Sequence, residues 1–206
     1  MDIIKKYFPG LSSDKLYQLS KLYSLYEEWN KKINVISRKD FENFYIHHVL
    51  YSLTPTFIIK FKKNTSILDV GTGGGFPGIP LAICFPESNF TLVDSVGKKT
   101  KVVNEIASST GINNITVANK RAEKIEGKFD FIISRAVAKL PIFMSWVGGK
   151  INSRGFNSIP NGVIYLKGGD FSEELSKLNY NYNIYNISDY VDEPYFKTKK
   201  IVHIYP

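Results

Sequence analysis

The stretch Ile67-Leu-Asp-Val-Gly-Thr-Gly-Gly-Gly-Phe-Pro-Gly-Ile-Pro80 places five glycines and two prolines between two apolar runs. The residues from Ser66 to Val70 are typical of a buried strand, and those from Gly78 to Cys84 are typical of a helix. Glycines between them allow a sharp turn and let a ligand lie against main-chain atoms without meeting a Cβ atom. A tight turn without a ligand needs only one or two glycines, so we expect a binding loop here.

From residue 66 onward, short apolar runs alternate with polar or helical segments, the order expected of parallel strands covered on both faces. The last two runs alternate apolar and polar residues, which suits a closing antiparallel pair. We therefore predict an α/β fold with a mainly parallel, doubly wound, Rossmann-like sheet of seven strands and an antiparallel C-terminal strand. The predicted strands are Ser66–Val70, Phe90–Asp94, Ile115–Ala118, Phe129–Ser134, Gly162–Lys167, Asn183–Ser188 and Lys200–Tyr205, and the helices between them are Gly78–Cys84, Lys98–Ser109 and Leu140–Val147.

Residues 1–60 read as a helical extension packed on the core, and residues 61–206 as the ligand-binding domain. Apolar side chains recur every three or four residues from Ser12 to Lys32, with Ser12 or Ser13 as the cap. A second helix is expected from Asp40, as a possible cap, to Leu53, ending before Pro55. The glycine-rich segment 148–162 reads as a mobile loop.

Composition limits the classes of function. The chain has 206 residues, of which 43% are hydrophobic, and no apolar run is long enough to span a bilayer. The N-terminal sequence MDIIKKYFPG lacks the features of a secretory signal, so we expect a soluble cytoplasmic protein. We also expect a monomer, although the sequence itself does not fix the oligomeric state. The single cysteine, Cys84, and the three histidines, His47, His48 and His203, are poorly spaced for a metal site, so we expect no metal.

The net charge is +8 at pH 7. A surplus of lysine and arginine attracts polyanions through phosphate contacts and counterion release, which makes nucleic acid a plausible partner. The same surplus also occurs on lysine-rich surfaces that only keep a protein in solution, so charge alone leaves both readings open.

The glycine spacing separates two kinds of ligand. Gly73-x-Gly75-x-x-Gly78 matches the dinucleotide fingerprint, but a pyrophosphate loop should begin right after the strand, and counting from Gly71 puts Phe76 where the third glycine should be. An acid two residues before alternating glycines, Asp69-x-Gly71-x-Gly73-x-Gly75, fits without this conflict. That pattern resembles motif I of the class I S-adenosylmethionine-dependent methyltransferases.

Two acids at strand ends suit that ligand, which carries a sulfonium and an ammonium group and no phosphate. Asp69 can favour the cationic end directly or through water, although a structural acid bonded to loop amides would read the same way. Asp94, at the end of the second strand, is placed to accept hydrogen bonds from a ribose diol, as it would for a nicotinamide cofactor. Ala122 and Glu123 follow the third strand and are expected beside the adenine. Arg135 follows the fourth and places a cation at the reaction end of the crevice, unless it only pairs with an acid of the scaffold.

The residues after the fourth strand also bear on the acceptor. Enzymes that methylate an exocyclic amine typically place an Asn/Asp-Pro-Pro-Tyr type motif there, but the chain has Ser134-Arg135-Ala136, and its look-alike Asp192-Glu-Pro-Tyr195 lies far downstream. Carbon methylation of a pyrimidine needs a cysteine nucleophile, and Cys84 falls inside a helix facing the expected core. A ring nitrogen with a free lone pair needs no base, so it fits what is left.

These segments together resemble one family. The Gly-rich block, Leu92-Val-Asp-Ser-Val-Gly-Lys-Lys99 and Ser134-Arg-Ala136 are similar to the bacterial RsmG (GidB) family, which methylates N7 of a guanine in 16S ribosomal RNA; Trp29-Asn30 with Asn34 and His48-Val-Leu-Tyr-Ser52 are similar to its N-terminal signatures. The resemblance implies 16S rRNA or the small ribosomal subunit as partner and S-adenosyl-L-methionine as cofactor, held by Gly71, Phe76, Ala122, Glu123 and Arg135. Lys167 also matches a family element near the pocket, which makes Arg135 and Lys167 the candidate catalytic residues, with no general base expected.

The chain departs from the family pattern at Tyr51, where the family usually has an aspartate, and in the long loop 148–162. Any hydrogen bond of that aspartate must be missing or replaced. Two other functions remain open on the residues alone: a nicotinamide-dependent oxidoreductase, because of the Gly73 spacing, and a non-catalytic RNA-binding module on the same fold.

Overall fold

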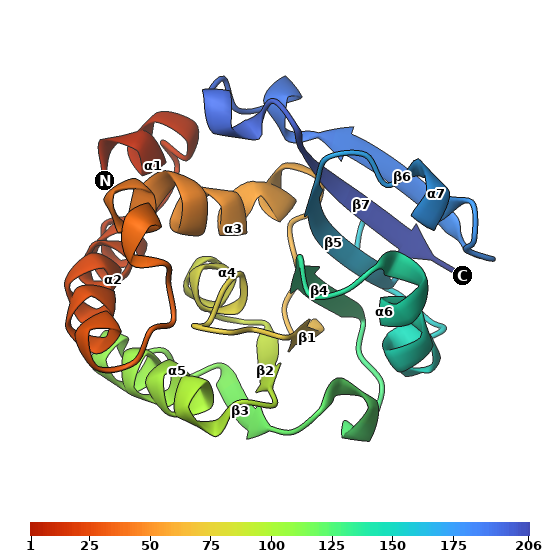
Figure 1. Ribbon diagram of the computed structural model, residues 1–206, viewed down its shortest axis with the longest axis horizontal. Coiled ribbons are helices and arrows are strands. Elements are labelled where there is room, and N and C mark those ends of the chain that lie inside the picture. The colour runs from red at the N-terminus through yellow and green to blue at the C-terminus, as the bar shows by residue number, and fades with distance from the viewer.

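Seven strands form one sheet in the order β3-β2-β1-β4-β5-β7-β6 in a computed structural model that describes all 206 residues (Figure 1). β1 pairs in parallel with β2 and β4, and the parallel pairing continues to β3 on one side and β5 on the other. β7 lies antiparallel between β5 and β6. This is the predicted sheet. The strands are β1 (Ser66–Val70), β2 (Asn89–Asp94), β3 (Ile115–Asn119), β4 (Phe131–Arg135), β5 (Gly162–Gly168), β6 (Asn181–Asn186) and β7 (Lys199–Tyr205).

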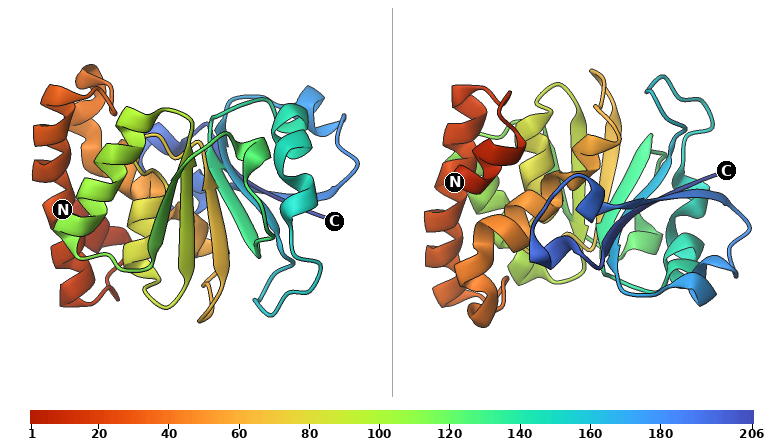
Figure 2. Two further views of the ribbon diagram at one scale, coloured as in Figure 1. Left: turned by 90° about the horizontal axis from the view of Figure 1, so that it is seen from below. Right: turned by 90° about the horizontal axis from the view of Figure 1, so that it is seen from above.

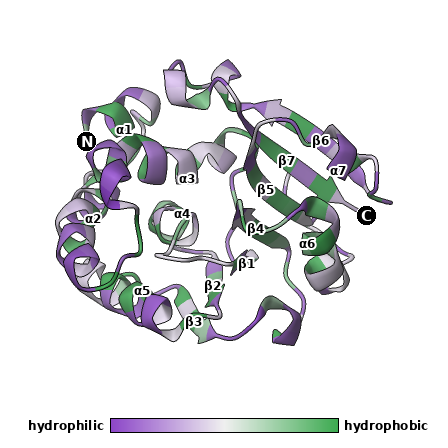
Figure 3. Cartoon of the chain, viewed as in Figure 1, coloured by the Kyte–Doolittle hydropathy of each residue, from purple (hydrophilic) through white to green (hydrophobic).

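Helices cover both faces of the sheet (Figure 2). One buried cluster joins α2, α4, α5 and the other N-terminal segments to one face, and a second joins α6 and α7 to the other. Hydrophobic residues run along β5 and β7, whereas α2 and α5 show mixed surfaces (Figure 3). No helix combines the length and the apolar character needed to cross a bilayer. The helices are α1 (Asp2–Tyr7), α2 (Ser13–Lys32), α3 (Tyr51–Leu53), α4 (Gly78–Cys84), α5 (Gly97–Thr110), α6 (Leu140–Val147) and α7 (Ser172–Leu175).

The long N-terminal helix α2 begins where its cap predicts. The Ser12 hydroxyl accepts a hydrogen bond from the backbone N–H of Lys15, so it satisfies one of the free donors of the first turn. Leu19, Leu22 and Tyr26 are buried on the face that meets the sheet cluster. Residues 1–60 therefore share their core with the strands. The short helix α1 has no strong sequence signal and was not predicted.

The segment between residues 38 and 57 differs from the single helix predicted there. It runs as a 3₁₀ helix (Arg38–Asn43), a π-helix (Phe44–Leu50), α3 and a second 3₁₀ turn (Thr54–Phe57) that contains Pro55. Pro55 does not end the segment because it lies in the first turn, where a missing N–H breaks no internal bond. Asp40 is not a cap; its carboxylate contacts the two histidines of the π-helix.

The loop between α6 and β5 lies at the amino ends of the strands, opposite the Gly-rich loop. Asp130, just before β4, accepts hydrogen bonds from Ser66 N on β1 and from the side-chain amides of Asn152 and Asn161 in the loop. Asn157 accepts a 2.9 Å hydrogen bond from Lys62 N. The segment predicted as a mobile loop is thus tied to the sheet at several points, on the side away from the expected ligand.

Candidate active site

A pocket of about 370 Å³ opens at the carboxyl ends of β1, β2 and β3, beside the Gly-rich loop. Open α/β sheets bind ligands at this edge, because the connections there diverge on the two sides of the first strand. The residues that line it are Val70, Gly71, Gly73, Val93, Asp94, Ser95, Val96, Lys99, Lys120, Arg121, Ala122, Glu123, Val137 and Trp146.

Five residues expected to bind the cofactor line this pocket, namely Gly71, Gly73, Asp94, Ala122 and Glu123. Sequence reasoning did not select its apolar walls. These come from the strand ends, the segment after β4 and the indole of α6. The sequence does not distinguish Trp146 from a core residue of the same helix, because apolar spacing does not show that tertiary packing brings α6 to the carboxyl end of β3. The missed apolar residues are Val70, Val93, Val96, Val137 and Trp146.

The glycines of the loop serve different purposes. Gly73 has φ +58°, and a Cβ atom there would meet nothing closer than the Gly71 carbonyl oxygen at 4.0 Å, so it would project into open space that a ligand can use. Gly78 is different, because its Cβ would lie 2.6 Å from the Asp69 carboxylate and 2.8 Å from Leu92 Cγ. Gly73 therefore keeps a surface bare for a ligand, whereas Gly78 lets α4 pack closely against the sheet.

Asp69 lies behind this loop and not in the pocket. Its side chain is fully buried, and Oδ2 accepts hydrogen bonds from the Thr72 hydroxyl at 2.6 Å and from Gly78 N at 2.8 Å. This geometry favours the structural alternative, an acid that ties the loop to the start of α4, while a contact of Asp69 with the cationic end of the ligand stays a prediction. The physical reason is strand alternation: Val70 faces the pocket, so Asp69 faces α4.

Asp94 remains at the pocket surface while it also holds the loop. Its Oδ2 accepts a 2.9 Å hydrogen bond from Gly73 N, and its Oδ1 accepts one of the same length from Val96 N. Each carboxylate oxygen has a second lone pair, so both can still accept a hydrogen bond from a ligand hydroxyl. Asp94 thus holds the Gly-rich loop in shape and keeps free acceptor capacity at the pocket surface.

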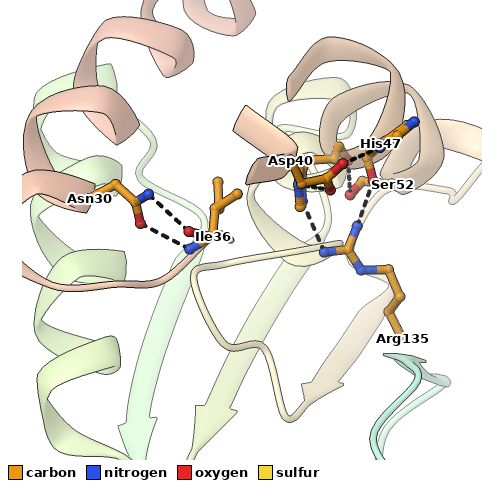
Figure 4. A network of polar contacts seen from close by, with 7 residues as sticks. Asn30, Ile36, Asp40, His47, Ser52 and Arg135 are labelled. Carbon is orange, nitrogen blue, oxygen red and sulfur yellow. Dashed lines mark hydrogen bonds and ion pairs between the residues drawn. The ribbon is translucent and has the colours of Figure 1, made fainter. Parts of the chain in front are cut away.

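An asparagine of α2 fixes the backbone above the loop. Asn30 Oδ1 accepts a hydrogen bond from Ile36 N at 3.0 Å, and its Nδ2 donates to Ile36 O at 2.9 Å (Figure 4). The same Oδ1 accepts a 2.9 Å hydrogen bond from Val35 N. Val35 in turn lies against Gly74, whose Cβ would come within 3.1 Å of Val35 Cβ. The N-terminal helical layer therefore helps to shape the binding loop.

Three further residues expected at the cofactor lie outside the pocket lining. A Cβ on Gly75 would meet Ile79 and the Tyr26 hydroxyl, so this glycine faces the protein interior. Phe76 is 4% exposed and packs its ring 4.8 Å from that of Tyr26. Arg135 leaves the end of β4 toward the N-terminal helices, with its guanidinium 5.6 Å from the centre of the Phe76 ring. These residues form the far side of the Gly-rich loop.

The guanidinium of Arg135 joins a network with the π-helix (Figure 4). Nη1 donates to the His47 carbonyl oxygen at 3.0 Å, and Nη2 lies 3.2 Å from His48 Nδ1. On its other side, His48 Nε2 lies 3.0 Å from Asp40 Oδ2, and the second oxygen of Asp40 contacts His47 Nδ1. Arg135 itself forms no ion pair with a scaffold acid, although that alternative was open from the sequence.

Tyr51, the residue that departs from the family pattern, belongs to this network. Its ring centre lies 5.7 Å from the guanidinium carbon of Arg135. This is a cation–π contact, whereas an aspartate could interact with Arg135 only through its charge. The ring is buried and packs edge-on against Tyr195 and Phe196. An aromatic contact with Arg135 therefore occurs at the position where the family usually has an aspartate.

Burial shifts the pKa values of the charged groups around the loop. It raises the pKa of Asp69 to about 7, even though the two hydrogen bonds to the carboxylate act in the opposite direction. Burial, with help from the charge of Arg135, lowers the pKa of His48 to about 4. Burial also lowers the pKa of Arg135, which remains charged at neutral pH. At pH 7 His48 is neutral and Arg135 is the cation of the network.

Lys167, a candidate catalytic residue, is engaged elsewhere. Its ammonium forms a 3.0 Å ion pair with Glu174 on α7, and both side chains are largely buried. The same Glu174 oxygen accepts a 2.7 Å hydrogen bond from Leu140 N at the start of α6. Lys167 does not line the pocket, so its surroundings favour a structural role in holding α6 and α7 to β5.

No cysteine lines the pocket. Cys84 is the last residue of α4, buried, and burial raises the pKa of its thiol to about 12. The carboxylates in the lining are Asp94 and Glu123. Such a site can position a ligand and exclude water, and it suits an acceptor atom that has no proton to lose.

Comparisons with known proteins agree with this geometry. The model of the GidB family, described as rRNA small subunit methyltransferase G, matches residues 15–196. A protein of Christiangramia forsetii named ribosomal RNA small subunit methyltransferase G is 50% identical over 204 residues, covering 99% of this chain and 96% of its own. Among solved structures, an S-adenosylmethionine-dependent methyltransferase of Aquifex aeolicus has a TM-score of 0.56 at 15% identity, covering 74% of this chain and 88% of its own. MtNAS in complex with S-adenosylmethionine has a TM-score of 0.59 at 12% identity, covering 93% and 76%.

The two structures share the fold, and the sequence match identifies the family. It runs from the first turn of α2 through the Gly-rich loop and the sheet to the 3₁₀ turn (Pro194–Phe196) before β7. The chain belongs to the GidB family of rRNA small subunit methyltransferases.

Proposed function

We propose that this protein transfers a methyl group from S-adenosylmethionine to N7 of a guanine in small-subunit ribosomal RNA. The observation that carries the proposal is the pocket at the carboxyl ends of β1 to β3, with the bare surface of Gly73 beside Asp94, in a chain of this family. The substrate class follows from the names of its relatives.

The residues present fit the cofactor. Asp94 would accept the ribose hydroxyls, and Gly71 and Gly73 would offer backbone next to them. Ala122 and Glu123 would lie along the adenine, against the apolar wall that includes Trp146. When bound, S-adenosylmethionine supplies an electrophilic methyl group on a sulfonium. We place its amino-acid end on the far side of the loop, toward Gly75, Phe76 and Arg135, because the Arg135 cation there has no acidic partner.

The acceptor follows from what the site lacks in reactive groups. Guanine N7 has a free lone pair, so no side chain has to remove a proton before transfer. The buried thiol of Cys84 is too far from ionisation to attack a pyrimidine ring. The task left to the protein is to hold the acceptor in line with the methyl group and to exclude water.

Basic side chains at the pocket rim suit an RNA substrate. Lys99, Lys120 and Arg121 line the pocket, and none of them forms an ion pair. S-adenosylmethionine carries no phosphate that would need them. Free cations beside a binding pocket attract phosphates of a nucleic acid and release counterions, in line with the net charge of +8.

We also propose that the protein acts as a monomer in the cytoplasm. Its exposed large apolar side chains are few and lie on several elements, among them Tyr17 on α2, Ile142 on α6, and Tyr182 and Ile184 on the edge strand β6, which argues against a broad apolar face for a second copy. Size-exclusion chromatography with light scattering tests the first part, and a concentration-independent mass near 23.4 kDa is expected. Cell fractionation tests the second.

Two measurements test the activity. S-adenosylhomocysteine should raise the melting temperature of the protein, and stabilisation by NAD(H) instead would favour an oxidoreductase. Borohydride and aniline cleave RNA at 7-methylguanine, so 16S rRNA treated with the enzyme and cofactor should gain one cleavage site. Binding of RNA with neither cofactor binding nor cleavage would favour a non-catalytic RNA-binding module.

A further inference from the structure

The groups that contact the charged guanidinium of Arg135 are all neutral. Its two contacting acceptors are the His47 carbonyl oxygen and the imidazole of His48. Its guanidinium carbon lies 5.6 Å and 5.7 Å from the ring centres of Phe76 and Tyr51. No carboxylate lies within ion-pair distance of the guanidinium. Guanidinium has five N–H donors, and the two contacts leave most of them free. A largely enclosed cation with free donors calls for an anionic partner from outside the scaffold.

The direction of each hydrogen bond in the network is fixed by chemistry. Arginine only donates, so His48 Nδ1 must accept from Nη2 and carries no proton. The carboxylate of Asp40 only accepts, so His48 Nε2 must carry the proton. One tautomer of neutral His48 therefore satisfies both neighbours, and the low pKa of its imidazolium keeps that neutral form at pH 7.

This arrangement differs from a direct aspartate–arginine pair in one respect. Asp40 fixes the imidazole, the imidazole fixes the guanidinium, and the aspartate never touches the cation. A direct pair would neutralise the charge of Arg135, whereas the interposed ring orients the guanidinium and leaves its charge for another group. The Asp40 carboxylate is itself held by His47 on its second oxygen.

An enclosed position narrows the choice of anion. Phe76 and Tyr51 are each 4% exposed, and His48 is 8% exposed, so little of the surface around the guanidinium is open to a macromolecule. A phosphate of a folded RNA would have to displace this packing. A small carboxylate fits such a position better than a macromolecule does, and the only anionic group of the proposed cofactor is the carboxylate of its amino-acid end.

We propose that Asp40 and His48 are positioning residues that orient Arg135 toward the carboxylate of the cofactor. The inference rests on the proposed function, because it takes S-adenosylmethionine as the ligand. It assigns to the N-terminal helical segment a share in cofactor recognition, exerted through Arg135.

Calorimetric titration with two ligands tests the inference. S-adenosylhomocysteine has the amino-acid carboxylate, and 5′-methylthioadenosine shares the adenosine and sulfur but lacks the amino-acid group. His48→Ala should weaken S-adenosylhomocysteine about tenfold or more, the loss expected for one charge-assisted contact, and leave 5′-methylthioadenosine within about twofold. Arg135→Ala should show the same selective loss.

His48→Asn supplies the rescue, because its amide oxygen can take the place of Nδ1 as acceptor for Arg135 and should restore most of the affinity. Tyr45→Phe, on the same π-helix, removes only a hydroxyl bonded to Ser20 O and should change neither ligand. If His48→Ala fails to fold, Asp40→Ala replaces it, because alanine leaves no acceptor for Nε2–H, with the ¹⁵N shifts of His48 as readout. Wild type should show a protonated Nε2, and Asp40→Ala should mix the tautomers and weaken only S-adenosylhomocysteine.

The outcomes separate the two proposals. Unchanged affinity for S-adenosylhomocysteine in both His48→Ala and Asp40→Ala would overturn the positioning role while leaving the proposed function intact. An equal loss of both ligands would also overturn it, because it would show general damage to the pocket. Wild-type protein that binds neither ligand would overturn the proposed function, and the inference with it.

Discussion

Asp69 and Gly78 are nine residues apart in the chain, and a 2.8 Å hydrogen bond from Gly78 N to Asp69 Oδ2 closes the Gly-rich loop between them. The bond explains why an acid and a glycine flank this loop. A side chain at 78 would collide with the carboxylate, and the carboxylate caps an N–H at the start of α4 that lacks a partner within the helix. The loop is thus pinned at its base, while Gly73 at its exposed side stays clear for a ligand.

Gly73→Val should abolish binding of S-adenosylhomocysteine while the protein stays folded. The branched side chain would fill the space beside the pocket and oppose φ +58°. Gly111→Val is the matched control, because Gly111 has φ +70° and open space but ends α5 away from the pocket. Calorimetry should show lost binding for the first variant alone. Near-normal affinity in Gly73→Val would refute the placement of the ligand.

Asp69 should make the protein less stable as the pH rises. Its folded pKa of about 7 lies above its ordinary value of 3.8, so the native state binds the proton more tightly than the unfolded state does. Its contribution to the free energy of unfolding is therefore present below about pH 4 and is lost as the pH rises to about 7. Asp69→Asn removes this titrating carboxyl group. The pH dependence due to all other groups cancels when the free energies of unfolding of the two proteins are subtracted. Urea unfolding of both proteins at pH 5 and pH 8 should show wild type losing stability relative to the variant; a constant difference would contradict the pKa shift.

Lys167→Met and Glu174→Gln should have overlapping effects on stability. The two side chains form one largely buried ion pair, so removing either partner leaves the other unpaired, at a cost of about 1–3 kcal/mol. The double variant should lose less than the sum of the single losses. Cofactor affinity should change little, because neither residue lines the pocket. A loss of methyl transfer in Lys167→Met without loss of stability would instead restore Lys167 as a catalytic candidate.

Lys120→Ala and Arg121→Ala should each weaken RNA binding. Binding weakens as salt rises, so a plot of the log of the RNA association constant against log salt has a negative slope. Removing one phosphate contact should make that slope less steep by about 1. Lys5→Ala on α1, which also removes one exposed cation but does not belong to the pocket rim, serves as the control. Filter binding of a 16S rRNA fragment at several salt concentrations measures the slope. Equal slopes for all three variants would place the RNA elsewhere.

Leu22→Ala should destabilise the whole protein by about 2–5 kcal/mol, because Leu22 is fully buried in the cluster that α2 shares with the sheet. Tyr17→Ala, on the exposed face of the same helix, should change the free energy of unfolding by less than about 0.5 kcal/mol.

We also propose that residues 61–206 do not fold without residues 1–60. A cooperative melt of the isolated 61–206 segment would show that the helical layer is dispensable.

The sheet could be predicted from the sequence because its strands are short apolar runs between turn residues. Ser66–Val70 and the helix Leu140–Val147 are confirmed to the residue. The fourth strand begins later than predicted, since Asp130 turns away to cap the amino ends of β1 and β4. The π-helix could not be predicted, because apolar spacing alone does not distinguish it from an α-helix.

The comparisons confirmed the predicted family, whereas the positions of individual site residues could be predicted only in part from the sequence. Asp69 was assigned to the ligand by its motif, although alternation with Val70 already placed it on the other face. The contact between Asp40 and His48 depends on an irregular helix and could not be read from their spacing. The roles of Phe76 and Arg135 at the cofactor remain predictions.

The loop before β5 has a practical consequence for studying the enzyme. It lies at the amino ends of the strands, remote from the pocket, and Ser153 in this loop is exposed. Cys84, the only native thiol, is buried and resists ionisation. A Ser153→Cys variant would therefore accept one fluorophore at one known position, so the protein could be tethered or tracked on single ribosomal particles with its substrate edge unobstructed.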